Sequence, residues 1–100
     1  MPDFSKIGGF DWDDGNSRKS IDKHAVNQRE AEEIFQDSRL LILDDDKHSQ
    51  REPRFQAYGV TADGRKLCVV FTLRKSGTLI RVVSARDMSR RERARYEEEA

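Results

Sequence analysis

The chain has 100 residues, of which 35% are hydrophobic and 38% charged, and its 19 basic and 19 acidic residues cancel. This length supports one domain with a modest core, and zero net charge removes the usual argument for nucleic-acid binding by a basic protein. The single cysteine excludes an internal disulfide and fits a reducing cytoplasm. Because no apolar run is long enough to cross a bilayer and no signal peptide is recognisable, we expect a cytoplasmic protein without a membrane partner.

The N-terminal part begins with a polar stretch over residues 1–9, which we expect to be a flexible arm before a domain over residues 10–100. Alternation of apolar and polar side chains at 10–12 favours a short edge strand. An aspartate at 13 or 14 is then placed to cap a helix over 15–24. The glycine, asparagine and serines of this helix are poor helix formers, so tertiary packing must hold it.

A second helix is predicted over residues 28–36, because Asn27 and Glu30 form a capping box with Asn in the first position. Its apolar side chains recur at helical spacing and predict one face packed against a sheet. A short apolar strand over 40–43 and a polar loop over 44–53 follow.

The remaining chain holds most of the sheet, divided by turn signals at Asp63-Gly64 and Ser76-Gly77. The predicted strands are 54–61, 65–74 and 78–85. An S-x-x-E capping box at 89–92 opens a last helix over 90–98. The predicted fold class is therefore α+β, an antiparallel meander sheet with two N-terminal helices and one C-terminal helix.

Two-residue loops at both turns would set the register of this meander, with these cross-strand neighbours: Tyr58 and Val69, and Phe71 and Val82. Because successive side chains alternate between faces, this register places Arg54 and Arg86 on one face and Arg81 on the other. A one-residue slip would exchange the faces. A β-bulge between Arg81 and Arg86 would bring all three arginines to one face.

Several short motifs occur in a fixed order along the chain: FDWD at 10–13, KHAV at 23–26, AEEIFQD at 31–37, VVFTLR at 69–74 and RVVSARDMSRRERARYE at 81–97. No single motif is specific, but the ordered set resembles the BrnT family of bacterial toxins over residues 10–97. The resemblance implies a ribonuclease toxin of a type II toxin-antitoxin pair with a RelE-like fold. It also implies a BrnA-like antitoxin that binds both the toxin and DNA, so that DNA contacts this chain only indirectly.

Three positions depart from the family pattern. Asn16 and Ser20 stand where the family commonly has Lys and Asn, and Ala25 replaces the Gly of K-H-G-V. Loss of the lysine predicts weaker RNA binding. Glycine ends a helix in the left-handed conformation at little steric cost, so Ala25 is either strained or the helix ends differently.

A metal-free ribonuclease needs groups that move two protons and cations around the phosphate. Arginine suits the second role, because its planar fork holds two phosphate oxygens and stays charged. We expect Arg54 and Arg86 to hold the phosphate, with Arg81 as a further candidate. The alternative for each is a surface ion pair with the abundant carboxylates.

Proton transfer is assigned to His48, with Glu52 orienting it or acting as the base, since an imidazole titrates near neutrality. His24 and Lys23 are candidate RNA contacts, although His24 also suits the negative end of a helix dipole. Tyr58 is a candidate for stacking on a base, and packing in the core is an equal alternative.

We expect no metal or other cofactor, because the run Asp44–Asp46 beside His48 is more typical of a solvated loop than of converging ligands. Cys68 is expected to be a small core residue. The leading function is a metal-independent endoribonuclease toxin. One alternative is a lapsed toxin that serves as an antitoxin partner and co-repressor, and another is a domain that completes a heteromeric fold.

Overall fold

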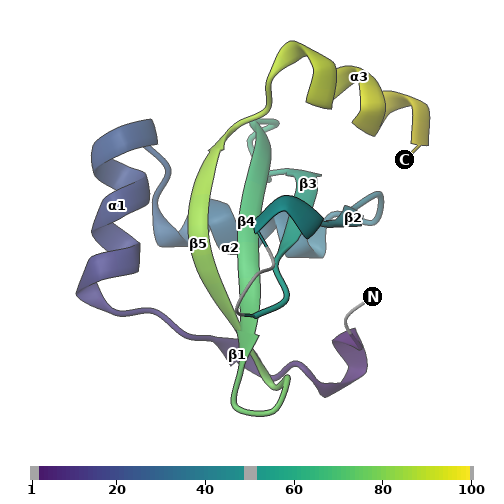
Figure 1. The fold of residues 1–100 in the computed structure, drawn as a ribbon. Coiled ribbons are helices and arrows are strands. Elements are labelled where there is room, and N and C mark those ends of the chain that lie inside the picture. The colour runs from purple at the N-terminus through teal and green to yellow at the C-terminus, as the bar shows by residue number, and fades with distance from the viewer. Residues whose placement is uncertain (1–2, 49–51, 100) are drawn as a thin grey trace.

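A computed structural model describes residues 3–48 and 52–99, except for the side chains of residues 17, 19–22 and 48. Over these residues, five strands form one sheet in the order β1-β5-β4-β3-β2 (Figure 1). The strands are β1 (Gly9–Phe10), β2 (Leu41–Asp44), β3 (Phe55–Val60), β4 (Lys66–Arg74) and β5 (Leu79–Asp87). The helices are α1 (Asp14–His24), α2 (Gln28–Glu33) and α3 (Arg90–Glu99), with short 3-10 segments η1 (Phe4–Lys6), η2 (Ile34–Gln36) and η3 (Asp46–His48).

The sheet is mixed, which corrects the predicted antiparallel meander. Strands β2 to β5 are antiparallel, but β1 pairs in parallel with β5 through Gly9 and Phe10. An alternating fragment indicates a strand without indicating its direction. Here the direction follows from the path of the chain, which passes along β5 before it enters α1 (Figure 1).

The hairpin between β3 and β4 differs by one residue from the predicted register. Its loop holds three residues, 62–64, because the Thr61 amide donates to the Arg65 carbonyl at 2.9 Å and Gly64 takes a positive φ of 89°. This is the three-residue hairpin in which a left-handed glycine follows a type I turn. Tyr58 consequently pairs with Cys68 instead of Val69.

A β-bulge in β5 decides which side chains share a face. Phe71 pairs with Val82, as the sequence predicts, but Val70 pairs with Ser84, so β5 contains one extra residue at this point. The bulge reverses the alternation beyond it. Arg81 and Arg86 therefore lie on the same face of the sheet, which corrects the expected separation of Arg81 from the other two arginines.

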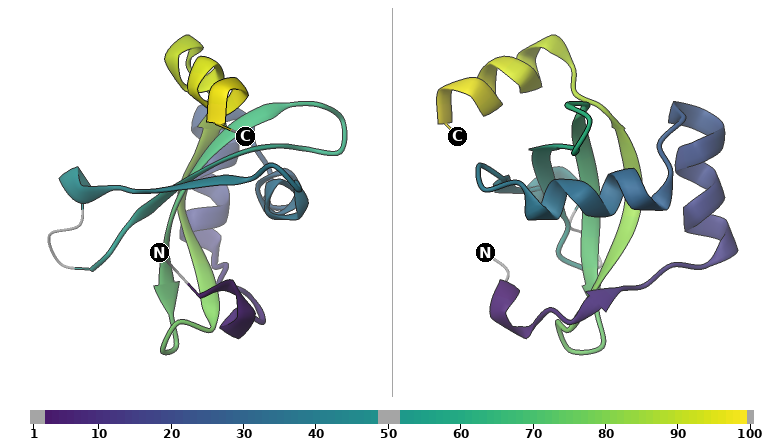
Figure 2. Two further views of the ribbon diagram at one scale, coloured as in Figure 1. Left: turned by 90° about the vertical axis from the view of Figure 1, so that its right-hand side faces the viewer. Right: turned by 180° about the vertical axis from the view of Figure 1, so that it is seen from behind.

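The main core lies between the opposite face of the sheet and the segment α2–η2, which crosses it (Figure 2). Ala31 and Ile34 are fully buried there, as the helical spacing predicts. At Gly59 a Cβ atom would lie only 2.8 Å from Ile34 Cβ, so glycine permits η2 to approach β3 closely.

Two side chains that precede β1, Phe4 and Ile7, lie against this core. The Phe4 ring of η1 lies 6.5 Å from the ring of Phe35. Phe35 also meets Phe10 and Phe71 edge to face, at centroid distances of 5.5 and 5.4 Å. Sequence reasoning missed this contact because no pattern in so short a polar stretch indicates what its one aromatic ring will meet.

A second, smaller cluster lies where α3 packs on the other face, and it buries Tyr58, Cys68, Met88 and Tyr96. Both predicted capping boxes are present, at Asn27 with Glu30 and at Ser89 with Glu92. Each helix in the described part of the chain is too short or too polar to span a membrane.

Candidate functional site

A pocket of about 300 Å³ opens on the sheet face opposite the main core. Its walls come from the start of α1, from the segment leading into β3, and from β4 and β5. The lining residues are Gly15, Asn16, Glu52, Arg54, Arg74, Arg81, Val82 and Val83.

The register explains why arginines converge on this pocket. Arg81 pairs with Thr72 across β4 and β5. Continuing the β3–β4 register one residue before β3 places Arg54 beside Thr72 on its other side, and the Thr72 hydroxyl donates to the Pro53 carbonyl at 2.7 Å. Arg74 is the next residue along β4 on the same face, a diagonal neighbour of Arg81. Guanidinium groups from three adjacent segments thus share one opening.

Arg74 and Arg81 pair with carboxylates from outside the sheet. Arg74 donates to Glu52, and both side chains are about one-third exposed. Arg81 pairs with Asp13 at 2.8 Å and with Asp11 at 3.6 Å. The Asn16 amide, followed by Arg81, lowers the pKa of Asp13. Ion pairs at this degree of exposure contribute little, so an incoming phosphate can compete with them for the guanidinium groups.

Asn16 fixes the start of α1 against β5. Its side chain is 8% exposed and donates to the carbonyls of Asp11 and Val82 at 3.1 and 3.0 Å. Its Oδ1 accepts from the Asp13 amide at 2.7 Å, while Asp13 accepts from the Asn16 amide at 3.0 Å. Asp13 is therefore the helix cap that the sequence suggested. The Asn16 side chain is already committed to structural contacts.

Other predicted site residues lie away from the pocket. Arg86 is at the far end of β5, where it donates to both Glu92 oxygens at 2.7 and 2.9 Å. Lys23 and His24 are exposed at the end of α1 opposite to the pocket. Tyr58 is 5% exposed, which leaves no free ring face for a base. Its hydroxyl donates to Gln56, and burial raises its pKa to about 12.

The loop that follows β2 is only partly as expected. The His48 side chain lies outside the described part of the chain, so its predicted role stays a prediction. Asp45 is 6% exposed and its amide donates to the Arg54 carbonyl at 2.8 Å, so the acidic run does not project wholly into water. Within the described residues, no three His, Cys, Asp or Glu side chains gather as metal ligands would.

Arg74 is the pocket residue that the sequence analysis missed. It ends the VVFTLR run two residues after Thr72, so simple alternation already placed it on the face of Arg81. Cys68 is buried as expected, and burial raises its pKa to about 12, which keeps the thiol protonated.

The fold and site together define a small α+β protein with a mixed sheet and an arginine-lined pocket on one sheet face. The model of a family described as the ribonuclease toxin BrnT of type II toxin-antitoxin systems matches residues 12–92. The chain belongs to this family. No curated protein matches it.

Proposed function

We propose that this protein is an endoribonuclease toxin that cleaves RNA without a metal ion, binding the scissile phosphate among Arg54, Arg74 and Arg81. The observation that carries the proposal is the convergence of these arginines on one open pocket. A guanidinium group holds two phosphate oxygens with parallel hydrogen bonds and remains charged at any physiological pH. The BrnT family match supports RNA as the target.

In the proposed reaction the ribose 2'-hydroxyl attacks the adjacent phosphorus. The new bond joins O2' to phosphorus, the bond to O5' breaks, and a 2',3'-cyclic phosphate and a free 5'-hydroxyl result. The arginines stabilise the charge that develops on the phosphate oxygens. Glu52, which lines the pocket, and His48 take the proton from O2' and return one to O5'.

The family match supports an antitoxin partner. We propose a BrnA-like antitoxin that neutralises the chain and carries the DNA contacts of the complex, and a RelE-like arrangement in which the RNA crosses the sheet. The single cysteine is compatible with action in the cytoplasm.

Incubation with labelled single-stranded RNA in the presence of a chelator tests the proposal. The wild type should yield fragments with cyclic phosphate ends. The double variant Arg54→Ala, Arg81→Ala should lose at least about a hundredfold in rate, because phosphate contacts made in the transition state are removed. Arg86→Ala should cleave normally, since Arg86 lies outside the pocket. Equal cleavage by the wild type and the double variant, or dependence on a metal, would overturn the proposal.

A lapsed toxin that acts only as an antitoxin partner and co-repressor is the second candidate. It is favoured by the carboxylate partners of Arg74 and Arg81 and by the structural use of Asn16, where the family commonly has a lysine. Expression of the chain alone in a bacterium separates the two candidates. A competent toxin arrests growth, whereas a lapsed one leaves growth unchanged and still binds its antitoxin.

A further inference from the structure

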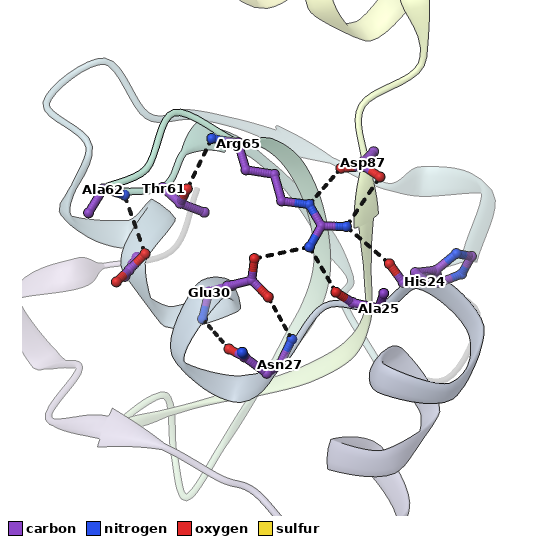
Figure 3. A network of polar contacts seen from close by, with 9 residues as sticks. His24, Ala25, Asn27, Glu30, Thr61, Ala62, Arg65 and Asp87 are labelled. Carbon is purple, nitrogen blue, oxygen red and sulfur yellow. Dashed lines mark hydrogen bonds and ion pairs between the residues drawn. The ribbon is translucent and has the colours of Figure 1, made fainter.

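Arg65 uses every N–H of its guanidinium group in one network (Figure 3). Nε and Nη2 donate to the two oxygens of Asp87 at 2.8 and 3.2 Å. Nη1 donates to Glu30 at 3.0 Å and to the Ala25 carbonyl at 2.8 Å, and Nη2 donates to the His24 carbonyl at 3.1 Å. Five donors therefore meet five acceptors, the full capacity of an arginine.

The acceptors belong to three segments that are distant in sequence: the end of α1, the start of α2 and the end of β5. The two carbonyls lie at the C-terminus of α1, where a cation complements the helix dipole. Arg65 lowers the pKa of Asp87 and, after the Asn27 amide, also that of Glu30. Both carboxylates are consequently ionised at neutral pH, and the network is held by charged hydrogen bonds.

The sequence of α1 makes this contact important. Residues 15–20 include glycine, asparagine and two serines, which give the helix little intrinsic stability. Its start is tied to β5 by Asn16 and its end by Arg65. Both ties lie within the helix, at Asn16 and at His24, so they are about 12 Å apart along its axis.

The start of the same helix forms a wall of the arginine pocket. Gly15 and Asn16 line it, and Asp13, the cap of the helix, pairs with Arg81. If the C-terminal end of α1 were released, the helix would turn about its Asn16 contact with β5. This rotation would change how Gly15 and Asp13 are placed relative to Arg54 and Arg74. We infer that Arg65 is a positioning residue of the pocket, which it holds in shape by clamping the far end of α1. For its effect on cleavage, the inference rests on the proposed ribonuclease function.

Arg65→Lys tests the clamp, because lysine keeps the charge but cannot offer five donors in a planar fork. Arg86→Lys is the matched control. Arg86 also holds a helix by paired hydrogen bonds to a carboxylate, but its helix, α3, contributes no residue to the pocket lining. Asp87→Asn weakens the same contacts of Arg65. It replaces Arg65→Lys as the test variant if Arg65→Lys does not fold.

Two readouts are compared well below the unfolding temperature, so that loss of folded protein does not contribute. Amide hydrogen exchange at Asp13 and Asn16 should become about tenfold faster in Arg65→Lys and stay unchanged in Arg86→Lys. RNA cleavage by Arg65→Lys should fall about tenfold in kcat with little change in KM, because the sheet arginines still bind phosphate while alignment is lost.

The clamp is overturned if exchange quickens only at residues 23–25, or if kcat per folded molecule is unchanged. A wild type that cleaves no RNA would remove the ribonuclease proposal. Hydrogen exchange at Asp13 and Asn16 would then be the measurement that tests whether Arg65 holds α1 in place.

Discussion

Ala25 ends α1 in the left-handed region, at a φ of 54°, where a Cβ atom is crowded by the following carbonyl oxygen. Its own carbonyl accepts from Arg65 at 2.8 Å, and Val26 beyond it is fully buried. The sequence left two outcomes open for this departure from the family pattern. The strained conformation is the one adopted, because contacts on both sides of Ala25 fix the path of the chain.

Ala25→Gly should therefore stabilise the protein by about 0.5 kcal/mol. Relief of the left-handed strain, about 1–2 kcal/mol, exceeds the entropy that glycine adds to the unfolded chain. Ala94→Gly, at an exposed position within α3, should have the opposite sign and cost about 1 kcal/mol. Urea unfolding of both variants measures the contrast. Destabilisation by both would mean that Ala25 is not strained.

At the scale of elements, α3 depends on a few polar contacts, because Tyr96 is its buried residue. The Tyr96 hydroxyl donates to Asp37 at 2.6 Å, and the same Asp37 oxygen accepts from the Val60 amide at 3.0 Å. The guanidinium of Arg39 lies 5.4 Å from the centre of the Tyr96 ring. Arg86 and Glu92 hold the other end of the helix.

Tyr96→Phe should lower the free energy of unfolding by about 2 kcal/mol, since it removes a hydrogen bond to a charged group. Tyr58→Phe is the matched control, because this equally buried hydroxyl donates to the neutral side chain of Gln56 and should cost about 1 kcal/mol. Denaturant unfolding gives both values. An equal cost for the two variants would contradict a special role for Asp37 in docking α3.

Prediction from sequence succeeded where the cause is local. The Asn27 and Ser89 caps depend on side chains three residues apart, and both boxes formed as expected. The predicted strand register was wrong where the pairing depends on contacts between two strands. Neither the three-residue loop at Gly64 nor the extra residue before Ser84 leaves a signal in either strand alone.

The same dependence on contacts between strands limited the prediction of the pocket residues. Arg54, Arg81 and Glu52 were singled out by residue type, and the pocket contains them. Arg86 was grouped with Arg54 by counting alternation, and the two do share a face. Alternation gives the face but not the position along the strand, and Arg86 lies at the far end of β5 with Glu92. Identifying the pocket required the register.

For the molecule as a whole, stability against pH follows from how its buried and paired groups titrate. Glu30, Asp37, Asp87 and Glu92 all have a lowered pKa in the folded state, for which Arg65 is the main cause at Asp87 and Arg86 at Glu92. The pKa values of Tyr58 and Tyr96 are instead raised by burial to about 12. The unfolded chain therefore binds more protons than the folded protein in acid, and fewer in strong alkali.

The urea midpoint should consequently be flat between about pH 5 and pH 9 and fall on both sides. On the acid side, stability is present above the unfolded carboxyl values of 4.5 for Glu and 3.8 for Asp, and is lost as the pH falls through the lower folded values. On the alkaline side the loss begins at the unfolded thiol value of 9 for Cys68 and continues from the unfolded tyrosine value of 10, because burial keeps the thiol and the hydroxyls protonated in the folded protein. In Asp87→Asn the urea midpoint should decrease less steeply as the pH is lowered into the acid range. A decline between about pH 8 and pH 6 would contradict this account, because none of these groups titrates there.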